Sequence, residues 1–222
     1  MDIVFYGASG HSVAVRDSVE VFWKPDPIAS VVAYIDDFRG DLGESIDGAP
    51  IISFETWRAS LLDCPVFLSL GDPQAKRALA QRISAAGGRF PSFYERSAPD
   101  ACRGATVGEG SVLGSLVSIG PATIIGRHVQ VMPLASVDAG CMVGDYASIC
   151  PSSTIFGRVV IEECVYVGAG ARIVNHEDEP LVVGAGAVIG AGAVLTRSVR
   201  PGERLSGNPA TDLRTLAAKR AT

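Results

Sequence analysis

The stretch VGEGSVLGSLVSIGPATIIGRHVQ, residues 107–130, places an aliphatic residue at every sixth position. The same register continues to residue 173 and resumes after an insertion of four residues. The aliphatic positions are Val107, Leu113, Ile119, Ile125, Val131, Val137, Val143, Ile149, Ile155, Ile161, Val167, Ile173, Val183, Ile189 and Leu195. A period of six fits neither the turn of an α-helix nor the two-residue alternation of a strand. It predicts a parallel β-helix of triangular coils, with three hexads to a coil and one shared aliphatic core.

The residues before this repeat follow a different pattern. Short apolar runs at 3–7, 30–37 and 65–72 read as strands. Residues 12–22 and 73–88 read as helices, and Pro73 in the first turn of the second one suits a helix start. The alternation of strands and helices over residues 1–95 predicts a small parallel sheet with helices, an α/β unit.

The composition of the chain bounds its partners and its location. The formal net charge of −5 does not favour nucleic-acid binding, which needs a basic face. Five cysteines stand at no paired or metal-ligand spacing, so we expect reduced thiols. No run of 18 apolar residues and no signal-peptide pattern occur. We therefore expect a cytoplasmic protein without a membrane span.

Three segments together carry a resemblance to a known family. The hexapeptide run, the closing LSGNPA (205–210) and the opening VFYGASGHS (4–12) are similar to those of bacterial nucleotide-sugar acyltransferases of the NeuD/PglD type. The resemblance implies a Rossmann-like domain at 1–95, a left-handed β-helix at 96–204 and a partly helical tail at 205–222. It also implies a homotrimer that uses acetyl-CoA as co-substrate and needs no metal.

By this resemblance the N-terminal domain holds the nucleotide end of a UDP- or GDP-linked sugar. Gly7, Gly10 and His11 would form a phosphate turn after the first strand, where free backbone N–H groups can meet an anion. Asp36 or Asp37 would bind the base or the ribose. Gly71 would line the same cleft, at the carboxyl ends of the strands. The alternative is that these glycines serve only as strand-to-helix turns.

The resemblance also implies that acetyl-CoA lies in the groove between neighbouring β-helices. Six small residues match the positions that meet the pantetheine and its thioester: Ser148, Gly157, Ala169, Gly170, Ala191 and Gly192. Small side chains would let the amides of the ligand approach the backbone of the coil. The alternative is that the turns of the coil require these residues by themselves.

The catalytic base is where the chain departs from the family. The central hexad of the family carries an acid followed by a histidine, and this chain has Asp138 followed by Ala139. The place of a second family histidine is taken by Ser148. The insertion loop carries His176 beside three acids, and we expect His128 to be structural. Asp138 and His176 are thus the candidate proton acceptors, with a solvated loop as the alternative reading of His176.

The missing histidine bears on the acceptor of the acyl group. A positioned base contributes about 10²–10⁴-fold, whereas an amine with a pKa near 8 is already about one-tenth free at pH 7. The missing histidine therefore favours acylation of an amine over a hydroxyl. Together with the resemblance, it implies an acetyl-CoA-dependent N-acetyltransferase acting on a nucleotide-linked amino sugar for surface glycan synthesis. Two alternatives stay open: O-acetylation of a sialic-acid-like sugar, and a catalytically silent protein that binds nucleotide sugars. A metal-dependent hydratase is disfavoured because His11, His128 and His176 are scattered along the chain.

Overall fold

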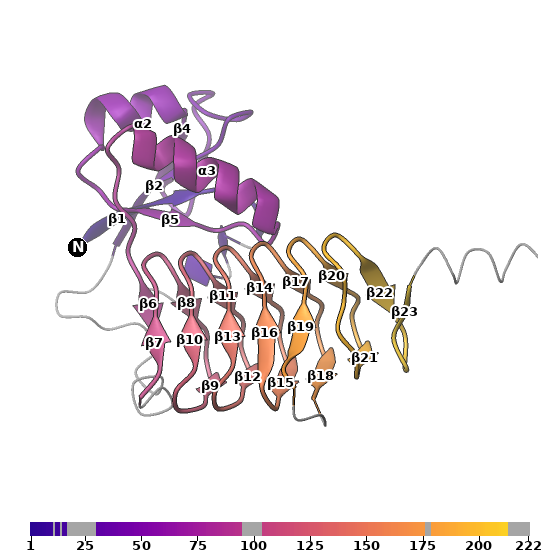
Figure 1. Cartoon of the computed structure of the whole chain (residues 1–222). Helices are drawn as coiled ribbons and strands as arrows, with labels where there is room; N and C mark the ends of the chain where they lie inside the picture. The colour runs from indigo at the N-terminus through magenta and orange to yellow at the C-terminus, as the bar shows by residue number, and fades with distance from the viewer. Residues whose placement is uncertain (11, 14, 17–29, 95–103, 176–178, 213–222) are drawn as a thin grey trace, which may run out of the picture.

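The computed structural model describes residues 1–10, 12–13, 15–16, 30–94, 104–175 and 179–212 (Figure 1). An N-terminal α/β domain rests on one side of a left-handed parallel β-helix. The fold class predicted from the sequence is confirmed. Within the described ranges no helix is long and apolar enough to cross a lipid bilayer.

The N-terminal domain is built on a five-stranded sheet of order β3-β4-β2-β1-β5. Its strands are β1 (Asp2–Tyr6), β2 (Ser30–Ile35), β3 (Ser45–Ile46), β4 (Ala49–Ile52) and β5 (Val66–Leu68). Pairing is parallel throughout except between β3 and β4. The strands predicted at 3–7, 30–37 and 65–72 are confirmed as β1, β2 and β5, whereas β3 and β4 were not foreseen.

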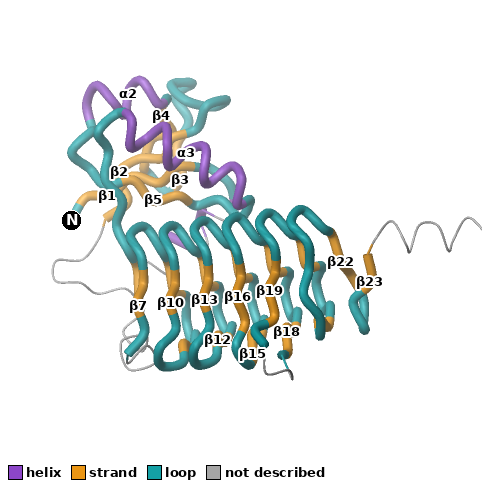
Figure 2. The backbone as a smooth tube through the Cα atoms, viewed as in Figure 1, coloured by secondary structure: helices purple, strands orange, loops and turns teal. Residues whose placement is uncertain are grey.

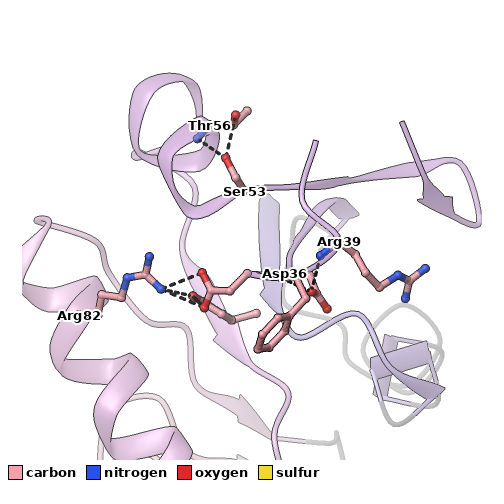
Figure 3. Close-up of polar contacts among 8 residues, drawn as sticks. Asp36, Arg39, Ser53, Thr56 and Arg82 are labelled. Atoms are coloured by element: carbon pink, nitrogen blue, oxygen red, sulfur yellow. Dashed lines mark hydrogen bonds and ion pairs between the residues drawn. The ribbon is translucent and has the colours of Figure 1, made fainter. Parts of the chain in front are cut away.

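Two helices of this domain have well-defined starts. Helix α2 (Phe54–Ser60) begins after Ser53, whose side chain accepts a hydrogen bond from the backbone N–H of Thr56 (Figure 3). Helix α3 (Pro73–Ala85) begins after Asp72, whose carboxylate accepts from the N–H of Ala75 at 2.8 Å. The predicted helix at 73–88 is confirmed as α3. Most of the helix predicted at 12–22 lies outside the described residues.

The β-helix has three faces, each a ladder of short strands that pair in parallel, except that the last strand of one face pairs antiparallel (Figure 2). The domain face contains β6 (Phe93–Tyr94), β8 (Val112–Leu113), β11 (Gln130–Val131), β14 (Ser148–Ile149), β17 (Tyr166–Val167), β20 (Val188–Ile189), β22 (Arg204–Ser206) and β23 (Thr211–Asp212). The apolar face contains β7 (Thr106–Val107), β10 (Ile124–Ile125), β13 (Met142–Val143), β16 (Val159–Ile161) and β19 (Leu181–Val183). The polar face contains β9 (Ser118–Ile119), β12 (Ser136–Val137), β15 (Thr154–Phe156), β18 (Arg172–Val174) and β21 (Val194–Leu195).

The hexad residues point inward and form one continuous core, as the sequence predicts. Leu205 joins the same core from β22, beyond the last regular hexad. Corners between faces need backbone in the left-handed region, which glycine adopts at Gly110 and Gly140 and which several larger residues adopt as well. Residues 213–222, where most of the predicted tail helix falls, lie outside the described residues.

The N-terminal domain sits on the domain face and gives this face its name (Figure 1). The side-chain amide of Gln130 donates to the carbonyl of Leu68 at 2.9 Å, and the hydroxyl of Ser148 donates to the carbonyl of Gly71 at 2.8 Å. Both donors are buried. The carboxyl end of β5 is therefore held directly against the β-helix.

Candidate functional site

The carboxyl ends of β2, β1 and β5 lie side by side, and we call this place the nucleotide edge. Gly7 follows β1 with φ of 108°, a value that favours glycine. A Cβ at Gly7 would stand 3.4 Å from the backbone oxygen of Ser69, which follows β5. The hydroxyl of Ser12 donates to the carbonyl of Gly7 at 2.6 Å. The structure thus brings Gly7, Gly10 and Gly71 to one edge, while His11 lies outside the described residues.

Asp36 shapes the turn that follows β2 (Figure 3). Its Oδ1 accepts hydrogen bonds from the backbone N–H groups of Phe38 and Arg39, both at 2.9 Å. Within the described part of the chain, no hydrogen bond engages its other oxygen, Oδ2. Asp36 therefore keeps one carboxylate oxygen for a donor such as a ribose hydroxyl or a base N–H.

Asp37 is engaged more completely than Asp36. Nη1 of Arg82, on α3, donates to Asp37 Oδ1 at 2.8 Å, and the Tyr6 hydroxyl donates to Oδ2 at 2.7 Å. Figure 3 shows Arg82 reaching toward the turn that follows β2. The Arg82 guanidinium also lies 3.8 Å above the ring of Phe54. Burial, followed by the hydrogen bond to Asp37, raises the pKa of Tyr6 well above its ordinary value. Asp37 thus serves a polar network that anchors α3 to the sheet.

Sequence reasoning missed two arginines at the nucleotide edge. Arg39 donates to the carbonyl of Ala8 at 2.9 Å and pairs with Glu44, so it joins the turns after β1 and β2. Its nearness to the acids in the string DDFRG was a usable signal. Arg82 had no such signal, because only the fold brings it to Asp37, 45 residues away.

Four of the predicted cofactor residues line one corner of the β-helix. Ala169 and Gly170 lie in the turn from β17 to β18, and Ala191 and Gly192 lie in the next turn, from β20 to β21. The N–H of Gly192 donates to the carbonyl of Ala169 at 2.9 Å, so the two turns stack directly. Apart from the chain neighbours, no atom in the described part of the chain lies within 4 Å of a Cβ built at Gly170 or Gly192. This open small-residue corner lets an extended ligand reach the coil backbone.

Ser148 lies apart from the small-residue corner. It belongs to β14 on the domain face, with 2% of its surface exposed. Its hydroxyl already donates to the carbonyl of Gly71. In this structure Ser148 therefore contacts the N-terminal domain from a strand of the domain face, whereas the small-residue corner lies where the chain turns from the domain face to the polar face.

Asp138 and Gly157 lie in consecutive turns from the polar face to the apolar face, which we call the acid corner. The N–H of Asp138 donates to the carbonyl of Ile155 at 2.9 Å, and a Cβ at Gly157 would stand 2.8 Å from the carbonyl oxygen of Asn175. Ala139 is exposed beside Asp138. Within the described ranges no hydrogen bond engages the carboxylate of Asp138, which leaves it available as a proton acceptor.

The insertion loop starts from the same acid corner. Residues 176–178, which include His176, lie outside the described residues, but the flanking Asn175 and Glu179 are joined by a hydrogen bond of 2.9 Å from Asn175 Nδ2 to the Glu179 carbonyl. Asn175 stands two coils from Asp138, which is about 10 Å at the usual strand spacing. Asn175, the residue before His176, therefore shares one corner of the β-helix with Asp138.

His128 has the structural role that the sequence analysis expected. Its ring is buried, stacks on Tyr146 at 5.3 Å and meets Phe90 edge-on at 4.5 Å. Burial lowers the pKa of His128 to about 4, so the ring is neutral near pH 7. In the described ranges, no three His, Cys, Asp or Glu side chains gather in a way that would hold a metal ion.

Comparisons with known families and proteins match both parts of the chain. Residues 2–83 match the family model of the PglD N-terminal domain, and residues 122–157 match the bacterial transferase hexapeptide (six repeats). A GDP-perosamine N-acetyltransferase of Escherichia coli O157:H7 is 39% identical over 109 residues, which are 49% of this chain and 49% of that protein. The chain thus spans about half the length of this curated relative.

Solved structures resemble nearly the whole chain. WeeI from Acinetobacter baumannii AYE superposes with a TM-score of 0.82 and 26% identity, over 96% of this chain and 100% of that one. PerB from Caulobacter crescentus, solved in complex with CoA and GDP-perosamine, gives a TM-score of 0.81 at 23% identity, over 96% and 97% of the two chains. At that identity the likeness to PerB shows the fold.

Proposed function

Because the chain belongs to the NeuD/PglD-like family of hexapeptide-repeat proteins, we propose that it transfers the acetyl group of acetyl-CoA to the amine of a nucleotide-linked amino sugar. The observation that carries the proposal is the pairing of a nucleotide edge with an open small-residue corner and an available acid in one chain. The similarity to a GDP-perosamine N-acetyltransferase supports the same reaction class and makes GDP-linked amino sugars the first substrates to test. Surface glycan synthesis in the cytoplasm belongs to this proposal.

The nucleotide edge would hold the nucleoside diphosphate of the sugar. Backbone N–H groups near Gly7 and Gly10 would meet phosphate oxygens, and Oδ2 of Asp36 would accept from the ribose or the base. Arg39 adds a positive charge at the same edge. Asp37 would act through Arg82, because both of its oxygens are already engaged.

The small-residue corner would hold the pantetheine arm of acetyl-CoA. At Gly170 and Gly192 a side chain would occupy the open space beside the backbone, so the absence of one lets the ligand's amides come close. Ala169 and Ala191 are exposed on the same turns. Gly157 has a second reason to be glycine, because its backbone is packed against Asn175.

The reaction proceeds by attack of the sugar amine on the thioester carbonyl. The new C–N bond forms, the C–S bond breaks, and the thiol of CoA leaves. Backbone N–H groups of the coil turns would stabilise the oxyanion. Asp138, directly or through a water molecule, would accept the proton that the amine loses, with His176 as a second candidate. Only a modest base is needed, because an amine with a pKa near 8 is already about one-tenth deprotonated at pH 7.

A homotrimer would complete the site. The acid corner runs along the edge of the β-helix farthest from the N-terminal domain, so the nucleotide edge and Asp138 lie on opposite sides of one chain (Figure 1). The apolar face beside that corner exposes Ile124 and Met142 in register on neighbouring strands. It carries a hollow of about 470 Å³ rimmed by Glu162 and Glu163. Exposed apolar ladders of this kind are typical of surfaces between subunits.

The test is release of CoA thiol from acetyl-CoA with GDP- and UDP-linked amino sugars between pH 6 and 9. We expect release to rise with pH, because the free amine is the nucleophile. Asp138→Asn should lower kcat about 10- to 100-fold, at the low end of a general base's usual contribution. Glu109→Gln, an exposed acid on another corner, should leave the rate unchanged. His176→Ala distinguishes the two candidate proton acceptors, Asp138 and His176. If this variant loses activity, His176 is the general base.

Three results would contradict the proposal. A product that mild alkali hydrolyses would be an ester, and the protein would then be an O-acetyltransferase. Nucleotide-sugar binding without thiol release from any sugar would indicate a catalytically silent protein. A wild-type rate independent of pH would exclude the free amine as the reacting form.

A further inference from the structure

Lys76 on α3 is buried between the N-terminal domain and the β-helix, with 1% of its surface exposed. Its Nζ donates to the carbonyl of His128 at 3.2 Å and to the carbonyl of Ala147 at 3.0 Å. These carbonyls belong to consecutive coils. No carboxylate in the described ranges forms an ion pair with Lys76, although buried ammonium groups usually have one.

The two hydrogen bonds that Nζ donates to backbone carbonyls are the only polar contacts that balance this burial within the described structure. Burial lowers the pKa of Lys76 from 10.5 to about 7, so the amine loses its proton within the physiological pH range. A neutral amine keeps two N–H donors, one for each carbonyl. A methionine would fill the same space without a desolvation cost, but it would leave the His128 carbonyl without its donor. Compared with an apolar side chain, Lys76 therefore adds hydrogen bonds that hold α3 at a defined position on the coils.

The segment that Lys76 holds is one wall of the nucleotide edge. The chain runs from β5 through Gly71 and Asp72 into α3, and successive coils contact it. Gln130 donates to the Leu68 carbonyl and Ser148 to the Gly71 carbonyl. The thiol of Cys164, on the next coil, lies 3.9 Å from the Pro73 carbonyl. Residues 68–76 thus contact the coils one after another, and Lys76 contributes two of the hydrogen bonds.

We infer that Lys76 is a positioning residue, which fixes the β5–α3 wall of the nucleotide edge at one register on the β-helix and so sets where the sugar is presented for acyl transfer. The inference rests on the proposed function, since the register affects catalysis only if a sugar is carried from the nucleotide edge to an acyl donor. Apolar packing alone tolerates sliding along a smooth coil surface, whereas paired hydrogen bonds do not.

The neighbouring residue offers a matched control. Arg77 also joins α3 to the β-helix, through an exposed ion pair with Glu163 at 3.2 Å. Exposed ion pairs contribute little, typically about 0–1 kcal/mol. Lys76→Met and Arg77→Met therefore remove one long cationic side chain each from the same helix and the same junction, but only Lys76→Met removes a buried directional contact.

The experiment compares the full-length wild type with Lys76→Met and Arg77→Met in three measurements. Hydrogen exchange, without ligand, should be about tenfold faster in β5 and α3 of Lys76→Met and unchanged in Arg77→Met. The dissociation constants of GDP, UDP and CoA, measured by calorimetry, should stay within about threefold of the wild-type values in both variants. Acetyl transfer should lose about 10- to 100-fold in kcat in Lys76→Met alone, since a misplacement of about 1 Å costs that much.

Separate outcomes decide the inference and the proposed function. Lys76→Gln, which keeps two N–H donors, should recover part of the exchange protection and of kcat, and it replaces Lys76→Met if that variant does not fold. If hydrogen exchange in β5 and α3 of Lys76→Met is as slow as in wild type, the inference is overturned. It is also overturned if Lys76→Met has a lower thermal midpoint but the full kcat, because Lys76 would then be a purely structural residue. If wild type transfers to no sugar, the proposed function fails, while the exchange measurement still decides whether Lys76 fixes the register.

Discussion

Two buried titratable side chains, Lys76 and His128, meet where the N-terminal domain joins the β-helix. Burial lowers the pKa of both, to about 7 for Lys76 and about 4 for His128. His128 is therefore neutral throughout the physiological range, whereas Lys76 titrates within it. The other titratable groups near Lys76 are Cys164, Cys150 and Asp72.

The lowered pKa of Lys76 predicts a dependence of stability on pH. Between pH 7 and 10.5 the unfolded chain holds the lysine proton and the folded chain does not. The free energy of unfolding therefore increases as the pH rises through this range. The contribution is about 1.4 kcal/mol per pH unit. Urea denaturation from pH 7.5 to 9.5 should therefore show a wild-type stability that rises relative to that of Lys76→Met. The stability of Arg77→Met should change with pH in parallel with that of wild type. If Lys76→Met also ran parallel to wild type, the pKa of Lys76 would not be lowered and the prediction would be wrong.

Asp36 and Asp37 show what a single residue's neighbours decide. In the sequence the two acids are equivalent candidates for the nucleotide. In the structure Asp36 closes its own turn with one oxygen, while Asp37 is taken up by Arg82 and Tyr6. The partner that distinguishes them comes from α3, far away in the chain, so no local pattern contained it.

At the scale of the element, the corners of the β-helix determine which turns tolerate a side chain. Gly110 and Gly140 have almost the same backbone, with φ of 72° and 69°. A Cβ at Gly110 would overlap Nδ1 of His128, whereas no atom of the described residues, apart from the chain neighbours, lies within 4 Å of one at Gly140. The His128 ring has no room to move, because Phe90 and Tyr146 contact it.

This difference predicts unequal costs for the same substitution. Gly140→Ala should lower the free energy of unfolding by about 1 kcal/mol, the cost of alanine in left-handed backbone. Gly110→Ala adds overpacking against a confined ring and should cost about 2–4 kcal/mol in total. Thermal and chemical denaturation of the two variants test this. If both variants lost the same free energy of unfolding, the His128 ring would be able to move away from the new methyl group at no cost.

The hexad pattern predicted the coils correctly because each inward position packs against other inward positions of the same repeat. Ile149 packs between Val131 and Val167 of the neighbouring coils, in the register that the repeat implies. Strands β3 and β4 have no such repeat and were missed. Short strands at the edge of a sheet depend on pairing partners more than on their own pattern.

At the scale of the whole molecule, the N-terminal domain and the acid corner lie on opposite sides of the β-helix (Figure 1). A sugar bound at the nucleotide edge of one chain would be presented away from the Asp138 of the same chain. Assembly through the apolar face would bring a second acid corner within reach, so activity and oligomeric state should change together.

A charge on the apolar face should therefore separate the subunits. Met142 is 49% exposed on β13, so Met142→Glu should leave the fold of the chain intact. We expect sedimentation to show a trimer for wild type and mostly monomer for Met142→Glu, with thiol release reduced about 10-fold or more. Leu116→Glu, which charges an exposed apolar residue on a different corner, is the control and should remain trimeric. A fully assembled and active Met142→Glu would contradict this use of the apolar face.

The sequence by itself determined the β-helix, the α/β domain and some of the residues that meet at the nucleotide edge, namely Gly7, Gly10, Gly71 and Asp36. Periodicity and strand ends are local properties, and parallel strands of one sheet must end on the same side. Only the tertiary structure decided that Ser148 and Lys76 join the two domains, that Arg82 engages Asp37, and that Asp138 faces away from the nucleotide edge. The contact between Arg82 and Asp37 depends on how α3 packs on the sheet. The other relations depend on which face of the coil the N-terminal domain covers, and a repeat whose hexads look alike in sequence does not specify that face.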